Sequence, residues 1–160
     1  MLTRYSAWAN SLLYLALGEL PEDELTKPRQ IVFGNLMRTL NHVYSIDLVW
    51  RAHLEGKPHG FTTRNPDLHG SFSELRVAQA TLDGWYLRHA EEMSDRVGEE
   101  FVEFTFIGGG EGAMTRGDIL LHVVNHTTYH RGHIADMLYH LHISPPTTDL
   151  PVFLRASAGA

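Results

Sequence analysis

Apolar residues recur at helical spacing in four long stretches of the chain, and this period predicts four helices. The first stretch covers about residues 4–18, with Trp8 and Leu12 in its apolar stripe. Gly18 and Pro21 end this stretch, because neither residue favours the continuation of a helix.

The second stretch begins near Pro28, whose fixed φ suits the first turn of a helix, and it runs to about Leu54. When its residues are placed about 100° apart around the axis, the apolar side chains fall within roughly half of the wheel. His42 and Asp47 lie inside this apolar arc, so both are predicted to face the interior. The apolar members are Ile31, Val32, Leu36, Leu40, Val43, Ile46, Val49, Trp50 and Leu54.

The third and fourth helices each follow a residue that favours the N-terminus of a helix. Ser71, with Glu74 three residues later, predicts a helix that reaches about residue 97. Thr115, with Asp118 three residues later, predicts a helix to about residue 143, beyond which two prolines prevent its continuation.

Between these two helices the period changes from that of a helix to that of a strand. Apolar and polar residues alternate over 101–107, which predicts a short strand. The glycines at 108–110 form a turn, and Ala113 with Met114 predicts a brief return strand. The Phe101–Phe106 stripe is expected to contribute to the core or to a dimer contact.

These elements predict an all-α fold, a four-helix bundle with a small β-hairpin-like excursion, in one domain covering residues 1–160. The proline- and glycine-rich segment 56–70 is a long loop, and a long connection permits neighbouring helices to be parallel. The tail from Thr147 is expected to be short and to lie along the bundle.

Charge and composition exclude several functions. The chain has 13 basic and 19 acidic residues, a net charge of −6, which argues against a nucleic-acid-binding surface. It has no cysteine, which excludes disulfides, zinc–thiolate sites, iron–sulfur clusters and a cysteine nucleophile. The apolar run at 11–20 is too short to span a membrane, and no signal-peptide pattern precedes it. We therefore expect a soluble, cytoplasmic protein.

The chain contains 11 histidines, and four of them lie on one side of the fourth predicted helix. His122, His126, His130 and His133 fall within an arc of about 80°. Two imidazoles one turn apart can bind one metal ion, but the first and third are roughly 11 Å apart along the axis. A site would therefore use one adjacent pair, either His122 with His126 or His126 with His130, and spacing alone leaves both possibilities open.

A third ligand is predicted on the second helix. His42 is the first candidate and His53 the second, although a histidine near a helix end that faces water is the preferred interpretation of His53. Three imidazoles would leave a coordination position for water or substrate, as in catalytic sites. Such a site does not distinguish zinc, nickel, iron and manganese. The alternative is that the histidines simply fill a polar groove.

The further candidates for the surroundings of the site are Asp47, Arg131 and Tyr129. Asp47 is expected either to orient a ligand imidazole or, preferably, to pair with Arg131 or Arg51. Tyr129 lies off the histidine stripe, so packing is its expected role rather than donation in the site. Gly132 is expected to permit the close approach of another helix.

Three segments resemble the DinB/YfiT-like superfamily of damage-inducible DinB-type proteins. They are the Trp-Ala-Asn of residues 8–10, the segment from Phe33 to His42, and the histidine-rich segment from His122 to His133; the Pro-Thr-Thr-Asp-Leu of residues 146–150 also fits. Only His133 departs from the pattern, because glutamine is common at that place. The resemblance covers nearly the whole chain.

The resemblance implies an up-down-down-up bundle, usually a homodimer, with a metal site on His42, His126 and His130 and with His122 lining the pocket. Some members are similar to transferases that join a low-molecular-weight thiol, such as mycothiol or bacillithiol, to an electrophile. A divalent ion lowers the pKa of a bound thiol, which favours this chemistry. A hydrolase that uses metal-activated water, and a non-enzymatic stress-response protein that binds metal or a small ligand, are the alternatives.

Overall fold

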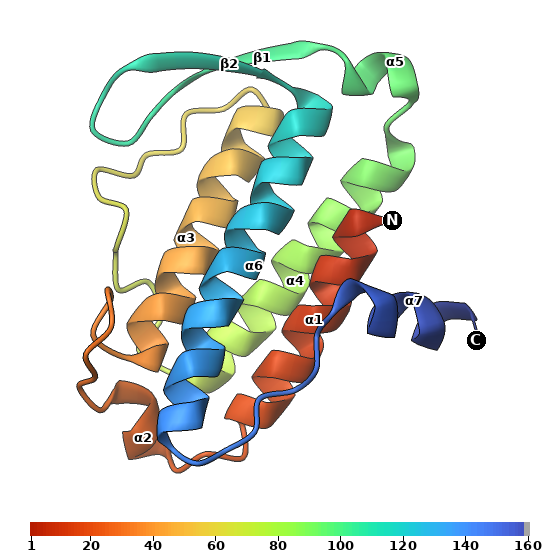
Figure 1. Cartoon of the computed structure of the whole chain (residues 1–160). Helices are drawn as coiled ribbons and strands as arrows, with labels where there is room; N and C mark the ends of the chain where they lie inside the picture. Colours follow the sequence, from red (N-terminus) through yellow and green to blue (C-terminus); the bar gives the residue numbers. More distant parts are fainter. Residues whose placement is uncertain (159–160) are drawn as a thin grey trace.

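Four long helices form the body of the protein: α1 (Leu2–Leu17), α3 (Leu36–Leu54), α4 (Phe72–Glu92) and α6 (Arg116–His140). The computed structural model describes residues 1–158. Helices α1 and α3 each pack against both α4 and α6. In Figure 1, α1 and α6 run down the view while α3 and α4 run up it, so the order is up-down-down-up. The predicted all-α bundle is confirmed.

The parallel arrangement of α3 and α4 depends on the long segment 56–70 between them. This segment leaves the end of α3 and returns along the outside of the bundle to the start of α4 (Figure 1). The predicted starts of α4 and α6 are confirmed, since the side chains of Ser71 and Thr115 accept hydrogen bonds from the backbone N–H groups of Glu74 and Asp118.

The predicted start of the second long helix at Pro28 is wrong, because α3 begins eight residues later at Leu36. Asn35 is extended and its side chain accepts a hydrogen bond from the backbone N–H of Arg38, while Gly34 has a φ of 81°. A left-handed residue followed by a strong cap cannot lie inside a helix. The apolar period before Leu36 therefore comes from a compact turn.

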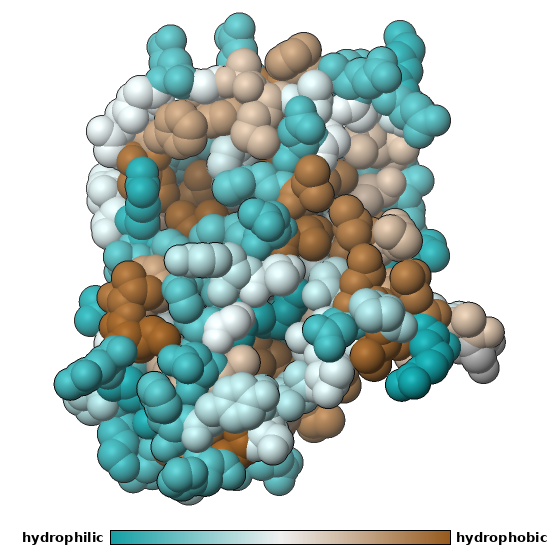
Figure 2. Space-filling view, in the orientation of Figure 1, coloured by the Kyte–Doolittle hydropathy of each residue, from teal (hydrophilic) through white to brown (hydrophobic). Residues whose placement is uncertain are grey.

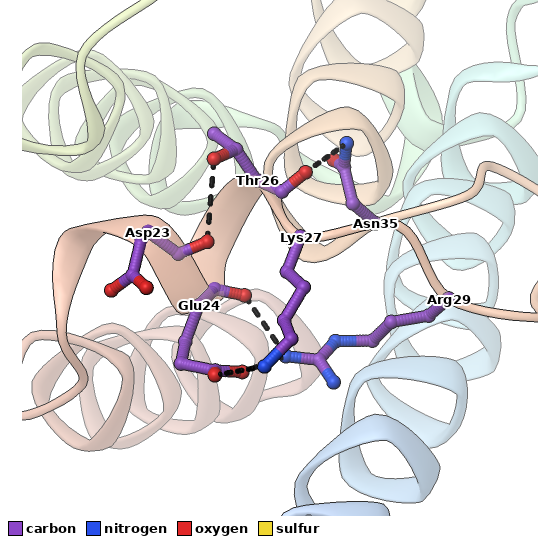
Figure 3. Close-up of polar contacts among 6 residues, drawn as sticks. All are labelled: Asp23, Glu24, Thr26, Lys27, Arg29 and Asn35. Carbon is purple, nitrogen blue, oxygen red and sulfur yellow. Dashed lines mark hydrogen bonds and ion pairs between the residues drawn. The ribbon is translucent and has the colours of Figure 1, made fainter.

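A short helix that the apolar pattern did not predict, α2 (Glu22–Thr26), precedes this turn and is attached to it (Figure 3). The guanidinium of Arg29 donates to the carboxylate of Glu24 at 2.7 Å and to its backbone carbonyl at 3.0 Å. The side-chain amide of Asn35 donates to the Thr26 carbonyl at 3.1 Å. One asparagine thus caps α3 and also holds the segment that leads into it.

The ends of two helices also differ from expectation. The third predicted helix stops at Glu92, and a separate helix, α5 (Asp95–Gly98), follows because Ser94 is extended and caps Val97. Helix α6 ends at His140 rather than near residue 143, and His142 adopts a φ of 58°.

The C-terminal tail forms a helix that the sequence did not predict, α7 (Leu150–Ala158). It packs on α1 as expected for a tail along the bundle, and Phe153 is buried with its ring 5.9 Å from that of Tyr5 and 5.5 Å from that of Trp8. These contacts join the two ends of the described chain.

The predicted β excursion is confirmed as an antiparallel hairpin of β1 (Phe101–Thr105) and β2 (Glu111–Thr115). It lies across the end of the bundle where α3 ends and α6 begins (Figure 1). Val102 and Phe104 are buried, whereas Phe101 is 73% exposed. The expected apolar stripe therefore divides, with Phe104 in the core and Phe101 at the surface.

Within residues 1–158 the core contains three apolar clusters. One contains leucines near the α2 end of the bundle, including Leu17, Leu36 and Leu75, and a second lies under the hairpin around Trp50 and Ile119. The third and smallest includes Phe153, where α7 packs on α1. Buried polar residues occupy the middle turns of all four long helices and form a polar layer. None of the helices in residues 1–158 is long and apolar enough to cross a membrane.

Candidate metal centre

Three histidines from two helices meet in the polar layer. His42 comes from the second turn of α3, and His126 and His130 come from successive turns of α6. One ring nitrogen from each lies within 4.8 Å of the others. His42 and His130 are buried and His126 is half-buried. The helical period made His126 and His130 neighbours, and the packing of α3 on α6 brings in His42.

The spacing of two of these rings is that of ligands on one ion. The Nε2 atoms of His42 and His126 are 3.2 Å apart. Two nitrogens each about 2.1 Å from a shared ion are separated by roughly 3.0–3.4 Å for angles between 90° and tetrahedral. The observed distance falls within this range, so the donor set fits a divalent metal ion.

The orientation of His42 is fixed from outside the helix bundle. Its Nδ1 lies 2.8 Å from the backbone carbonyl of Arg64, which can only accept, so Nδ1 carries the proton. The lone pair of His42 is therefore on Nε2, the atom that faces His126. Phe33 stacks on the other side of the imidazole, with ring centroids 4.2 Å apart. A hydrogen bond from the second ring nitrogen to a carbonyl, like that of His42 to Arg64, orients metal-bound imidazoles in known sites.

All three rings are held in the neutral form that a metal requires. Burial, together with the nearby imidazoles of His130 and His42, lowers the pKa of His126 to about 3. Burial and the neighbouring His42 and His133 lower the pKa of His130 to about 4. Burial also lowers the pKa of His42. At neutral pH the three nitrogens can bind an ion without first losing a proton.

His122, the other candidate ligand on α6, lies beside the three clustered histidines and is not part of the cluster. Its ring is 6.0 Å from that of His126 and 4.8 Å from that of Trp50. His122 lines a cavity of about 270 Å³ that also contacts His42 and His126. The expectation that His122 belongs to the pocket agrees with this position.

His53, the alternative third ligand, lines the same cavity but stands apart from the triad. Its ring contacts Trp50 and Phe104, and only 9% of its surface is exposed. The preferred interpretation of His53 as a histidine that faces water is therefore wrong. The hairpin covers the end of α3, and the helical period of α3 contains no information about an element that packs on it from elsewhere in the chain.

Asp47 does not contact the imidazoles, and it does not pair directly with an arginine. Its Oδ2 accepts a hydrogen bond from Gln79 at 3.2 Å, and Gln79 also donates to Asp83 at 2.9 Å. Asn10 donates to both oxygens of Asp83 and accepts from Arg131 at 3.2 Å. Burial raises the pKa of both aspartates. We call these five residues the buried polar network; it links Asp47 to Arg131 only indirectly.

The other expectations for α6 are divided. Arg131 is buried and also donates to the hydroxyl groups of Tyr5 and Thr128, so it serves the helix interface rather than the metal centre. Tyr129 is 64% exposed, and its ring lies 5.0 Å from that of His130. It therefore packs on His130 at the surface of the protein and not in the core. The close helix approach expected at Gly132 is wrong, because nothing in residues 1–158 lies within 4 Å of a Cβ built there.

Two residues near the site were not found from the sequence. Arg64 acts through its backbone carbonyl. Every residue has this group, so the residue type at position 64 does not indicate the contact. Phe33 lies in the turn that was assigned to a helix, where it was treated only as part of a motif. Both depend on contacts between segments that are distant in the chain.

The whole chain matches known proteins of one family. The model of the DinB family matches residues 1–159. The chain is 30% identical over 170 residues to Protein DinB of Bacillus subtilis (strain 168), a match that covers 96% of this chain and 91% of that protein. Its fold resembles the crystal structure of a DinB-like protein from Bacillus cereus, with a TM-score of 0.65, 17% identity and coverage of 88% and 90% of the two chains. The chain therefore belongs to the DinB family.

Proposed function

We propose that this protein binds one divalent metal ion through His42, His126 and His130 and transfers a low-molecular-weight thiol to a small electrophile. The observation that carries the proposal is the pair of Nε2 atoms of His42 and His126, which lie 3.2 Å apart on neutral rings, with the His42 ring held in orientation by the Arg64 carbonyl. Three imidazoles leave coordination positions for a ligand from outside the chain. The ion could be zinc, nickel, iron or manganese, because imidazoles accept several divalent metals.

A divalent ion held there would lower the pKa of a thiol bound beside it, and so favour the thiolate. The chain has no cysteine, so the thiol must come from a separate molecule. In the transfer, the sulfur forms a bond to an electrophilic carbon, and the leaving group departs with its bonding electron pair. The thiol proton passes to solvent, so that no proton acceptor on the protein is required.

The protein's own residues supply position and exclude water. The Arg64 carbonyl and the ring of Phe33 hold the His42 ring in place. His126 and His130 lie on successive turns of α6, so both face the same side of that helix. The cavity beside His126 has mainly apolar walls, and an apolar surrounding strengthens the attraction between a cation and a thiolate. Among the described residues that line it, none is a carboxylate. His53 and His122 also line it, and a neutral imidazole can act as a general base, so a hydrolase that uses metal-activated water stays the second candidate.

The first test is metal content and affinity in protein purified without a histidine tag. We expect about one equivalent of ion, and we expect His126→Gln to abolish tight zinc binding while His140→Gln, an exposed histidine on the same helix, leaves it intact. If the native protein contains no metal and takes up none on titration, the proposal fails. The structural alternative, histidines that fill a polar groove, would then remain.

The second test is catalysis by the metal-loaded protein with a panel of small thiols and electrophiles. Acceleration that is lost on chelation and in the His126→Gln variant supports the transferase. Stoichiometric metal without acceleration in any combination favours the non-enzymatic stress-response protein instead. The homodimer and the cytoplasmic location implied by the resemblance are parts of the same proposal, and light scattering after size-exclusion chromatography tests the dimer.

A further inference from the structure

The cavity beside the metal centre lies between α3, α6, the hairpin and the segment 56–70. In Figure 2 the surface is hollowed below the hairpin, and the floor of the hollow is coloured as hydrophobic. His42 and His126 form one end of this cavity. A compound bound in this cavity would therefore lie against two of the three proposed ligands.

Aromatic rings form another part of the cavity wall, in contact with His53 and His122. Phe104 meets Trp50 edge to face at 4.9 Å, and Phe106 meets Phe104 in the same way at 5.1 Å. Gly112, which pairs with Phe104 across the hairpin, makes room for these rings, because a Cβ there would lie 2.6 Å from Phe104. The faces and edges of these rings favour a flat apolar group.

The mouth of the cavity carries a positive charge. Arg64 lines the cavity and its side chain is exposed, and within residues 1–158 its guanidinium forms neither an ion pair nor a hydrogen bond. With no carboxylate among its described lining residues, the cavity presents one free cation beside apolar walls.

We propose that this cavity selects an electrophile with a small flat apolar body and one anionic group, such as an aryl-substituted carboxylate that also carries a leaving group on a carbon atom. The apolar body packs against Trp50, Phe104 and Phe106, and the anion pairs with Arg64. This inference rests on the proposed function for the identity of the compound as an electrophile, but binding in the cavity does not require the metal ion. At about 30 Å³ per water molecule, 270 Å³ holds roughly nine waters, so one aromatic ring with a short chain fits.

The test is the affinity of 3-phenylpropanoate, measured by calorimetry and by tryptophan fluorescence, for both chelator-treated and zinc-loaded protein. Two further probes separate the contributions: 3-phenylpropanamide lacks the charge, and propanoate lacks the ring. We expect 3-phenylpropanoate to bind more tightly than either in the metal-free protein. That protein is informative because a carboxylate there cannot gain affinity by binding zinc.

Variants assign the two contributions to residues. Arg64→Gln should weaken 3-phenylpropanoate binding roughly three- to fivefold and leave the amide unchanged, as expected for an exposed ion pair. Phe106→Ala should weaken both probes roughly two- to tenfold, because Phe106 is half-exposed and its loss removes a wall without removing core. Arg88→Gln and Phe101→Ala are the matched controls, since both side chains are exposed and neither lines the cavity.

Equal affinity for the carboxylate and the amide, or an unchanged affinity in Arg64→Gln, would overturn the inference. So would zinc uptake with no binding of 3-phenylpropanoate in either form, and that result would leave the proposed metal site intact. Conversely, selective binding by a protein that takes up no zinc would support the cavity and reject the proposed function. The failures of the two proposals are thus distinguishable.

Discussion

His130 and His133 face each other on α6 with their Nδ1 atoms 3.2 Å apart. Because both rings present Nδ1, one nitrogen must donate and the other accept. A neutral His130 that binds an ion through Nε2 has its proton on Nδ1, so His133 is then the acceptor. His133 is therefore positioned to orient His130.

We expect His133→Leu to weaken zinc binding roughly tenfold, because the acceptor for His130 is removed. His133→Gln should bind nearly as tightly as the natural protein, since the amide oxygen can accept the same hydrogen bond. Competition with a chromophoric chelator measures both affinities. Equal affinities for the leucine and glutamine variants would show that His133 does not orient the ligand.

The metal-free protein should lose stability as the pH falls from about 6.5 towards 4. The pKa values of His126 and His130 are about 3 and about 4 in the folded state, below the ordinary 6.5. Their contribution to the free energy of unfolding is therefore present above pH 6.5 and is lost as the unfolded chain takes up protons below it. Urea unfolding at a series of pH values measures the slope.

The His126→Gln variant gives the control for this pH dependence. Glutamine does not titrate, so the free energy of unfolding should fall less steeply with decreasing pH than in the natural protein. His140→Gln, at an exposed position of the same helix, is the matched comparison for the substitution itself. A natural slope in His126→Gln would mean that burial of His126 does not cause the acid sensitivity.

Asp47→Asn should stabilise the protein at neutral pH by about 1–3 kcal/mol, the cost of an unpaired buried polar group. Within residues 1–158, Asp47 Oδ1 and Gln79 Oε1 are buried without partners, and an asparagine supplies a donor that a carboxylate lacks. Burial raises the pKa of Asp47 above its ordinary value, so its protonated form contributes stability at low pH that is lost as the pH rises.

The gain from Asp47→Asn should therefore shrink as the pH falls below the raised pKa of Asp47 in the folded protein, and it should be smallest near pH 4, where an aspartate in the unfolded chain is also protonated. Thermal unfolding at pH 4 and pH 7 compares the two conditions, with Asp23→Asn as the exposed control. An Asp47→Asn protein that is less stable than the natural one at pH 7 would show that the charge itself stabilises the buried polar network.

Two glycines should respond to alanine in opposite directions. At Gly112 the new Cβ would collide with Phe104, so Gly112→Ala should destabilise the protein by about 1–3 kcal/mol and perturb the fluorescence of Trp50. At Gly132, inside α6, the Cβ meets nothing in the described chain, so Gly132→Ala should stabilise it by about 0.5–1 kcal/mol. Denaturant unfolding of both variants checks the signs, and Gly70→Ala serves as a control with open space around it.

The fold could be predicted from the sequence wherever a local signal and the tertiary structure agree. Ser71 and Thr115 mark true helix starts because a cap acts within its own turn. The helix start predicted at Pro28 was wrong, because Asn35 caps α3 and the turn before Asn35 is attached to α2. Helix α7 was missed because its stability comes from Phe153 packing on Tyr5 and Trp8, contacts that span almost the whole chain.

The candidate site divides in the same way. The helical period placed His126 and His130 on one face, and the apolar arc of α3 placed His42 inward. Which histidine pair meets His42 depends on how far α3 is displaced along α6, and spacing within one helix does not contain that quantity. The wheel also placed Asp47 correctly in the interior but could not say which helix it faces, and its partner proved to be Gln79.

Arg131 lies about 140° around α6 from His126, on the side that meets α1, where Asn10 and Tyr5 hold its guanidinium. These hydrogen bonds to α1 lie on the side of α6 away from α3, and they determine the rotation of α6 about its own axis. A turn of even one residue step, about 100°, would carry the histidines away from α3 altogether. A substitution at Asn10, which touches no imidazole, would thus change the metal centre by changing its angle, with the chemistry of every ligand left as it was.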